Sequence, residues 1–205
     1  MKINVGVIFG GRSVENEISV ITAAQTMAAM NREKYNIVPI YISKEGHWYT
    51  GDKLMTTDNY RDMKALLSSV EEVYFRPIYG DNKLYKVRKH MFGSDVVTTI
   101  DVILHCLHGT SGEDGSLQGL IEMTGIPYAC PNPLASANGM DKITMKMILK
   151  ESGIPVIDYM WFSDKEWLSE QEACVARAEK LNYPLIVKPA NLGSSVGIKA
   201  VHNRE

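Results

Sequence analysis

The chain has 205 residues and lacks three features that would place it in a special class: a long apolar run, an excess of charge and a set of paired cysteines. No apolar run approaches the length that crosses a membrane, so we expect no membrane partner. A net charge of −2 argues against a dedicated nucleic-acid surface. The three cysteines are widely spaced and odd in number, which is typical of free thiols in a reducing cytoplasm.

A secretion signal is also not evident, because Met1 leads directly into a strand pattern. The composition is that of an ordinary globular chain, since 45% hydrophobic and 22% charged residues can build a sizeable core. The length suits one large domain or two small ones, and the proline-bounded connector Pro127–Pro133 favours two. We therefore expect one domain over residues 1–130 and a second over residues 131–205.

The N-terminal segment predicts a strand, a helix and a second strand. The short apolar runs Ile3–Phe9 and Asn36–Ile42 are typical of buried strands. Ser13 is the expected helix N-cap, and the helix should end near Met30. The residues expected to face inward recur at helical spacing: Val14, Ile18, Ile21, Ala24 and Ala28. This order of elements opens a doubly wound α/β fold with a parallel sheet.

The turn after the first strand lies at the edge where such sheets bind ligands. Its sequence, Gly10-Gly11-Arg12-Ser13, is not the dinucleotide fingerprint Gly-x-Gly-x-x-Gly. Glu15 follows this turn, and its carboxylate could hold a small ammonium group. It could also cap the helix and offset the helix dipole, and spacing alone favours this second interpretation.

Residues 43–100 are the least informative part of the chain. We expect a hairpin at Glu45–Tyr49, a short helix over Tyr60–Leu67, and strands over Val70–Ile78 and Lys83–Val87. The histidines of this segment, His47 and His90, are most simply surface or packing residues.

A third buried strand, Val102–Leu107, runs into the glycine-rich loop His108–Gly115, and a helix should follow over Ser116–Thr124. A metal site of His105, Cys106 and His108 is disfavoured, because neighbours on a strand point to opposite faces. The loop also carries two acids, Glu113 and Asp114. They could form an acid–base pair, but capping of the next helix is the favoured interpretation.

In the second domain, a helix should begin at Met140-Asp141-Lys142 and end at Gly153. We expect a strand over Val156–Phe162 and then a helix from the Ser163 cap to about Lys180. The short strand Leu185–Val187 precedes Lys188 and a loop with two glycines and two serines. This loop either folds over nucleotide phosphates or forms an ordinary hairpin, and it is not a Walker A loop.

Four motifs stand in order on the chain: Gly10-Gly11-Arg12-Ser13-Val14-Glu15 with Ser19; His108-Gly109 with Gly112-Glu113-Asp114-Gly115 and Gln118-Gly119; Met140-Asp141-Lys142; and Lys188-Pro189 with Gly193-Ser194-Ser195-Val196-Gly197. In this order they resemble the D-alanine–D-alanine ligase family of ATP-grasp enzymes. The resemblance runs from Met1 to Glu205, is specific at the motifs, and is loose over residues 43–100. It implies an N-terminal substrate-binding domain followed by the first part of an ATP-grasp domain.

The resemblance also implies the chemistry. ATP, with Mg²⁺ or Mn²⁺, phosphorylates the carboxylate of one D-alanine, and the amine of a second D-alanine attacks the acyl phosphate to make D-alanyl-D-alanine for peptidoglycan. The family pattern assigns catalytic roles to Glu15, which holds the first ammonium group, and to Ser194, bonded to it. His108 matches a residue near the first substrate's carboxylate. The positions that match ATP-binding residues are Lys142, Lys188, Ser195, Val196 and Gly197.

The family continues well beyond the point that corresponds to Glu205, and the continuation carries the adenine pocket and the metal ligands. We therefore expect an N-terminal fragment that holds no metal ligands of its own and is inactive alone. Two alternatives stay open: a D-alanyl-D-serine or D-alanyl-D-lactate ligase, and a non-catalytic binding or dimerisation module. Because the family is commonly dimeric and the first helix is apolar, we also expect a homodimer through the N-terminal domain.

Overall fold

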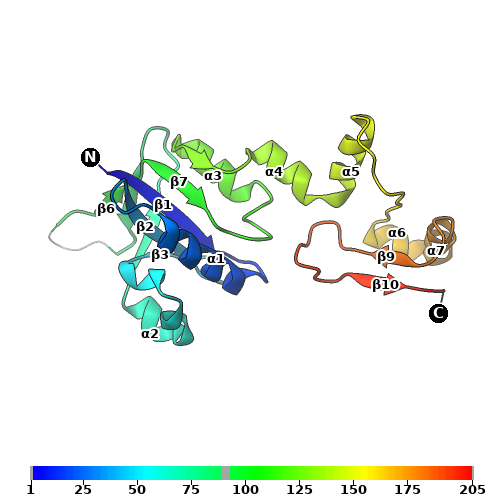
Figure 1. The fold of residues 1–205 in the computed structure, drawn as a ribbon, viewed down its shortest axis with the longest axis horizontal. Coiled ribbons are helices and arrows are strands. Elements are labelled where there is room, and N and C mark those ends of the chain that lie inside the picture. Colours follow the sequence, from blue (N-terminus) through cyan, green and yellow to red (C-terminus); the bar gives the residue numbers. More distant parts are fainter. Residues whose placement is uncertain (1, 89–92, 205) are drawn as a thin grey trace. The chain divides into compact units, whose positions relative to one another are not determined.

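The structure is a computed structural model that describes residues 2–88 and 93–204 (Figure 1). The chain divides into two compact units, Met1–Ala137 and Asn138–Glu205. His90, predicted as a surface or packing residue, lies outside the described residues, and so does Glu205. Among the helices of the described part, none is long and apolar enough to cross a membrane.

The first unit is built on one eight-stranded sheet in the order β6-β5-β4-β3-β2-β1-β7-β8 (Figure 1). Strands β2, β1, β7 and β8 are parallel, and the remaining pairs are antiparallel. The parallel strands are β1 (Ile3–Gly10), β2 (Tyr35–Ile42), β7 (Val102–His105) and β8 (Tyr128–Ala129). The predicted α/β class is therefore confirmed.

The central strand β1 divides the core between the two faces of the sheet. Val5, Val7 and Phe9 pack with helix α1 (Asn16–Ala29) on one face. Ile8 points the other way and belongs to the cluster that includes helix α3 (Ser116–Thr124). The period of two along a strand therefore explains why nearly every residue of this strand is apolar.

The antiparallel half of the sheet comes from the segment that the sequence described least well. The hairpin is confirmed, because β2 pairs with β3 (Trp48–Thr50), and β4 (Glu71–Phe75) and β5 (Lys83–Lys86) follow. The edge strand β6 (Val96–Thr99) was not predicted, although its β-branched residues favour a strand. The predicted helix over Tyr60–Leu67 is wrong in its bounds. It is replaced by the 3₁₀ segments Asp52–Met55 and Thr57–Arg61 and by α2 (Met63–Ser68).

Helix α1 has nearly the predicted bounds, but it buries a different face from the one predicted. Its predicted inward residues Val14, Ile18 and Ile21 are 70%, 54% and 47% exposed. The buried face instead consists of Asn16, Ser19, Val20, Ala23 and Met27. The Ser13 N-cap is also wrong, because Glu15 occupies that position and Ser13 Oγ accepts a hydrogen bond from the Glu15 N–H at 3.0 Å.

The second unit begins within helix α4 (Pro133–Met140). This helix was not predicted, because the sequence indicated a helix that begins only at Met140. Helix α5 (Lys142–Glu151) begins as predicted, since Asp141 accepts a hydrogen bond from the Thr144 N–H at 2.7 Å. The expected long helix after Ser163 is two short ones, α6 (Asp164–Ser169) and α7 (Gln171–Glu179), because Glu170 leaves the helical conformation.

The predicted strand Val156–Phe162 is not formed, because this extended segment has no strand beside it among the described residues. The sheet of the second unit consists of β9 (Leu185–Val187) paired with β10 (Lys199–Val201).

Candidate functional site

Two loops meet at the carboxyl edge of the parallel strands. The Gly11–Glu15 turn follows β1, and the His108–Gly115 loop leads from β7 to α3. The register places Gly10 beside Ile42, and the Gly11 N–H donates to the Ile42 carbonyl at 2.8 Å. Ligands of parallel α/β sheets bind at this edge, so the fold brings the first two sequence motifs to one place.

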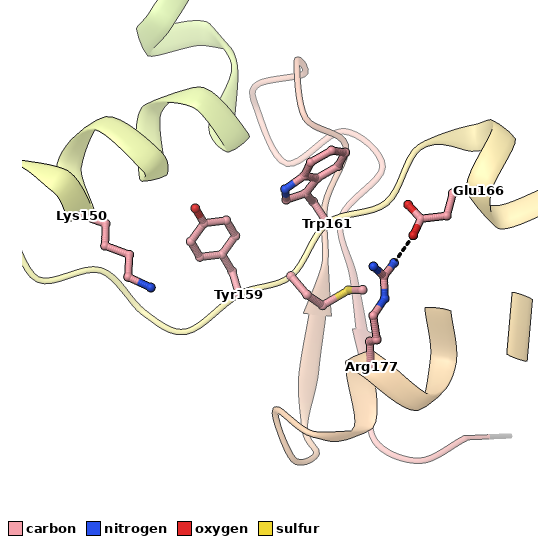
Figure 2. Close-up of a pocket in the computed structure, with 6 residues that line it drawn as sticks. Lys150, Tyr159, Trp161, Glu166 and Arg177 are labelled. Atoms are coloured by element: carbon pink, nitrogen blue, oxygen red, sulfur yellow. Dashed lines mark hydrogen bonds and ion pairs between the residues drawn. The ribbon is translucent and has the colours of Figure 1, made fainter. Parts of the chain in front are cut away.

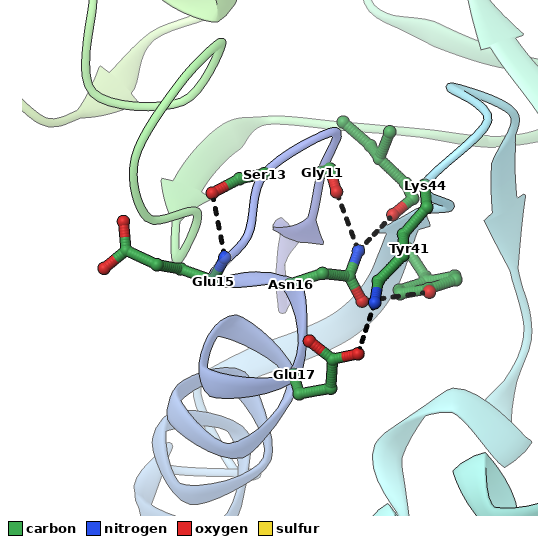
Figure 3. Close-up of polar contacts among 8 residues, drawn as sticks. Gly11, Ser13, Glu15, Asn16, Glu17, Tyr41 and Lys44 are labelled. Carbon is green, nitrogen blue, oxygen red and sulfur yellow. Dashed lines mark hydrogen bonds and ion pairs between the residues drawn. The ribbon is translucent and has the colours of Figure 1, made fainter. Parts of the chain in front are cut away.

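The carboxylate of Glu15 lies against the backbone of Gly109. Figure 3 shows the Glu15 side chain at the start of α1. A Cβ atom at Gly109 would lie 2.5 Å from Oε2 of Glu15 and 2.6 Å from Oγ of Ser13. Gly109 also has a positive φ of 72°, a conformation that glycine adopts at little cost. Glu15 is only 8% exposed. The sequence motif thus places a mostly buried carboxylate at the binding edge.

His108 lies on the same edge and is tied to helix α1. Its Nε2 atom lies 2.9 Å from Oγ1 of Thr22. The loop after it is folded by its own acids: Glu113 Oε2 accepts from the Gly109 N–H at 2.8 Å. Asp114 accepts from the N–H groups of Ser111 and Ser116 at 2.8 and 3.0 Å. Burial opposes ionisation of Asp114, but these bonds outweigh it and lower its pKa.

These contacts favour a structural role for the two acids of the loop over an acid–base pair. The predicted capping is wrong for Glu113, which bonds the loop, and the N-cap position itself is Gly115; Asp114, one residue earlier, bonds the amide of Ser116, the first residue of α3. His105 and Gln118 also hold this loop, because each places a side-chain nitrogen 2.9 Å from the Gly112 carbonyl. Burial lowers the pKa of His105.

His105 and His108 have different partners, so they are not placed as one metal site with Cys106. Within residues 2–88 and 93–204, no group of three His, Cys, Asp or Glu side chains is placed to hold a metal ion.

Two buried polar residues of α1, Asn16 and Ser19, were missed as parts of this edge. They are 3% and 0% exposed. The sequence did carry a signal for them. Their positions share the helical spacing of Val20, Ala23 and Met27, and reading only apolar residues hides that face.

In the second unit, Lys142 lies at the root of the glycine- and serine-rich loop. Its ammonium group donates to the carbonyls of Leu192 and Ala190 at 2.5 and 3.3 Å. Its backbone N–H also donates to the Ala190 carbonyl, at 3.1 Å. Lys142 therefore anchors the turn that precedes Gly193.

Lys188 is exposed at the end of β9 and carries a charge that can meet a phosphate. Ser194 and Ser195 have positive φ angles of 47° and 61°, and so does Gly197, at 73°. The loop closes through Val196 N–H to Gly193 and Ile198 N–H to Ser195, at 3.0 and 3.2 Å. Consecutive residues of this kind can turn backbone N–H groups toward an anion.

A hollow of about 470 Å³ in the second unit involves none of the motif residues. It is lined by Tyr159, Trp161 and Arg177 among others, and Arg177 is already paired with Glu166 at 2.5 Å (Figure 2). The aromatic residues come from the extended segment Val156–Phe162, which pairs with no strand in the described part of the chain. The candidate site is therefore the motif loops and not this hollow.

The chain matches the family described as D-ala D-ala ligase N-terminus over residues 4–131 and the one described as D-ala D-ala ligase C-terminus over residues 148–205. A D-alanine–D-alanine ligase of Thermosipho melanesiensis is 41% identical over 99% of this chain, which corresponds to 54% of that protein. The chain thus spans about half the length of the curated relatives it matches.

Solved structures agree. The VanG D-Ala:D-Ser ligase of Enterococcus faecalis is 28% identical, with a TM-score of 0.79 over 100% of this chain and 57% of that one. A D-alanine–D-alanine ligase of Bacillus anthracis, solved in complex with ATP, is 30% identical, with a TM-score of 0.62 over 98% of this chain and 51% of that one. From its sequence and its fold, the chain belongs to the D-alanine–D-alanine ligase family.

Proposed function

We propose that the chain supplies the first-substrate site and part of the ATP site of a ligase that joins two D-alanines. The observation that carries this proposal is the contact of the Glu15 carboxylate with Gly109, beside His108, at the carboxyl edge of the sheet. The carboxylate of Glu15 binds the ammonium group of the first D-alanine through a charge-assisted hydrogen bond. His108, held by Thr22, lies near the carboxylate of the same substrate.

ATP is the second substrate of the proposed reaction. The exposed ammonium of Lys188 and the hydroxyls of Ser194 and Ser195 have the chemistry that phosphate oxygens require. Val196 and Gly197 complete the loop that covers the phosphates. For Lys142 to meet a phosphate, its ammonium must exchange the carbonyls of Ala190 and Leu192 for phosphate oxygens.

These residues position the reactants and neutralise charge, which is most of what phosphoryl transfer requires of a protein. The γ-phosphate passes to the carboxylate of the first D-alanine, and the amine of the second displaces phosphate from the acyl phosphate. Bound Mg²⁺ or Mn²⁺ would neutralise the phosphates. The described residues contain no fitting set of ligands, so we assign the metal to no residue of this chain. The product would serve peptidoglycan synthesis in the cytoplasm.

A D-alanyl-D-serine ligase is the second candidate, because the similarity to the VanG D-Ala:D-Ser ligase covers the whole chain. The first-substrate site described above is the same for both reactions, since each begins with D-alanine.

We also propose a homodimer through the first unit. The outer face of α1 and its preceding turn expose Val14, Ile18 and Ile21, which form an apolar strip. In light scattering, Ile18→Glu should give a monomer, whereas Met123→Glu, at a 58% exposed position on α3, should leave a dimer intact. A monomeric parent protein at high concentration would contradict this proposal.

The function is tested with the full-length gene product, ATP, Mg²⁺ and D-alanine, alone or with D-serine or D-lactate, by phosphate release and mass spectrometry of the product. D-alanyl-D-alanine as the main product supports the proposal. A mixed product with D-serine or D-lactate supports the second candidate or its lactate counterpart, and no product supports a non-catalytic module. The 205-residue chain produced alone should be inactive. Turnover comparable to that of the full-length protein would contradict the proposal that this chain holds only part of the ATP site.

A further inference from the structure

The inner face of α1 begins with a buried polar network rather than with apolar side chains. Ser19 is fully buried, and its hydroxyl accepts from the Gly10 N–H at 2.8 Å and donates to the Cys106 carbonyl at 2.6 Å. Gly10 is the last residue of β1, and Cys106 directly follows β7. One hydroxyl therefore ties the ends of two neighbouring strands to the helix.

Asn16 makes the corresponding connection to β2. Its amide nitrogen donates to the carbonyls of Gly11 and Ile42 at 2.8 and 3.3 Å, and its oxygen accepts from Tyr41 Oη at 3.2 Å (Figure 3). Ile42 is the last residue of β2. Burial raises the pKa of Tyr41, so its hydroxyl keeps the proton that it donates.

This network encloses the turn that carries Glu15. Gly11 begins the turn and Asn16 follows it. The Gly11 N–H and the Asn16 amide nitrogen both donate to the carbonyl of Ile42, so both ends of the turn are bonded to the end of β2. Packing alone does not require polar side chains here. Apolar residues, such as Val20 and Met27 farther along the same face, would fill these positions equally well. A buried polar network fixes its members in one arrangement because each unmade bond is costly.

We propose that Asn16 and Ser19 are positioning residues that hold the Glu15 carboxylate in place against Gly109 for the ammonium group of the first substrate. The inference rests on the proposed function of Glu15. It predicts that loss of the network weakens binding of the first D-alanine more than it weakens binding of ATP.

The test compares Ser19→Ala and Tyr41→Phe with the control Thr50→Ala in the full-length gene product. Thr50 is 5% exposed, and its hydroxyl donates to the Pro39 carbonyl at 2.7 Å in the same sheet. Within the described part of the chain, this hydroxyl bonds Pro39 and not the Gly11–Glu15 turn. The control therefore loses a buried hydroxyl bond of the same kind without touching the network. Tyr41→Phe removes only one hydroxyl and serves if Ser19→Ala fails to fold.

We expect each network variant to raise KM for the first D-alanine about 2-fold to about 12-fold, the factor that corresponds to one hydrogen bond. KM for ATP should stay unchanged in these variants, and both KM values should stay unchanged in Thr50→Ala. In a Glu15→Gln background, Ser19→Ala should add nothing further, because it acts through Glu15.

Equal effects of Ser19→Ala and Thr50→Ala on KM for the first D-alanine would overturn the inference. Full additivity of Ser19→Ala with Glu15→Gln in this KM would overturn it too. If Glu15→Gln itself leaves KM for the first D-alanine unchanged, the proposed role of Glu15 fails, and the inference that rests on it fails too. If Glu15→Gln raises KM but the network variants do not, only the positioning role fails.

Discussion

The carboxylate of Glu15 leaves no room for a side chain at position 109, because a Cβ atom there would lie 2.5 Å from Oε2. This relationship joins two motifs that lie far apart in the sequence. It also makes Gly109 as much a part of the candidate site as the residues with functional groups.

Gly109→Ala should therefore displace Glu15 and also strain the backbone, since φ is 72° at this position. We expect a loss of at least about 1 kcal/mol of stability and a higher KM for the first D-alanine. Gly119→Ala is the matched control. It lies within α3 with nothing within 4 Å of its Cβ, and it should stabilise the helix by about 0.5 to 1 kcal/mol. Equal unfolding midpoints and KM values for the two variants would refute this view of Gly109.

Lys142→Met should loosen the root of the Gly193–Gly197 loop, because the carbonyls of Leu192 and Ala190 lose a charged donor. Such bonds contribute about 1.5 to 3 kcal/mol each when charged. We expect faster proteolysis within residues 190–198 and a higher KM for ATP. Lys150→Met, in the last turn of the same helix, should change neither. An unchanged cleavage rate in Lys142→Met would show that the lysine does not anchor the loop.

His105 should make the stability of the protein depend on pH. Its folded-state pKa lies below the ordinary value of 6.5 because of burial, so the unfolded chain binds the proton more readily. Its contribution to stability is present above pH 6.5 and is lost as the pH falls through the folded-state pKa. In urea unfolding between pH 5 and 8, His105→Gln, whose amide can still donate to Gly112, should flatten this part of the profile. A profile identical to that of the parent would exclude this histidine as the cause.

The family pattern bonds Ser194 to Glu15, so we expect substitutions of these two residues to be coupled in the full-length gene product. Glu15→Gln weakens a charge-assisted bond, and Ser194→Ala should then add little to KM for the first D-alanine, because members of one network are not additive. A double-mutant cycle on this KM measures the coupling. Fully additive effects would argue that the two residues act separately.

The sequence predicted well those elements whose burial is set by apolar runs. β1 is an apolar run buried on both faces of the sheet, and its bounds differ from Ile3–Phe9 by one residue. The orientation of α1 could not be predicted in this way. Its inner face carries Asn16 and Ser19, which are buried because strand ends offer them hydrogen bonds and not because they are apolar.

Strand predictions failed where strand formation depends on a neighbouring strand. Val156–Phe162 has strand-like residues, but a strand exists only beside another strand, and the described chain provides none there. For the site, the motifs led to Glu15, His108 and Lys142. Only the fold revealed that Gly109 contacts Glu15 and that Lys142 is bonded to loop carbonyls.

The most direct test of the central claim is KM for the first D-alanine in the full-length gene product, compared between the parent protein and Glu15→Gln at saturating ATP. Loss of one charge-assisted bond, about 1.5 to 3 kcal/mol, predicts a KM raised by a factor of about 10 to about 150, with KM for ATP unchanged. An unchanged KM for the first D-alanine, or an equal rise in both KM values, would contradict the assignment of Glu15 to the ammonium group of that substrate.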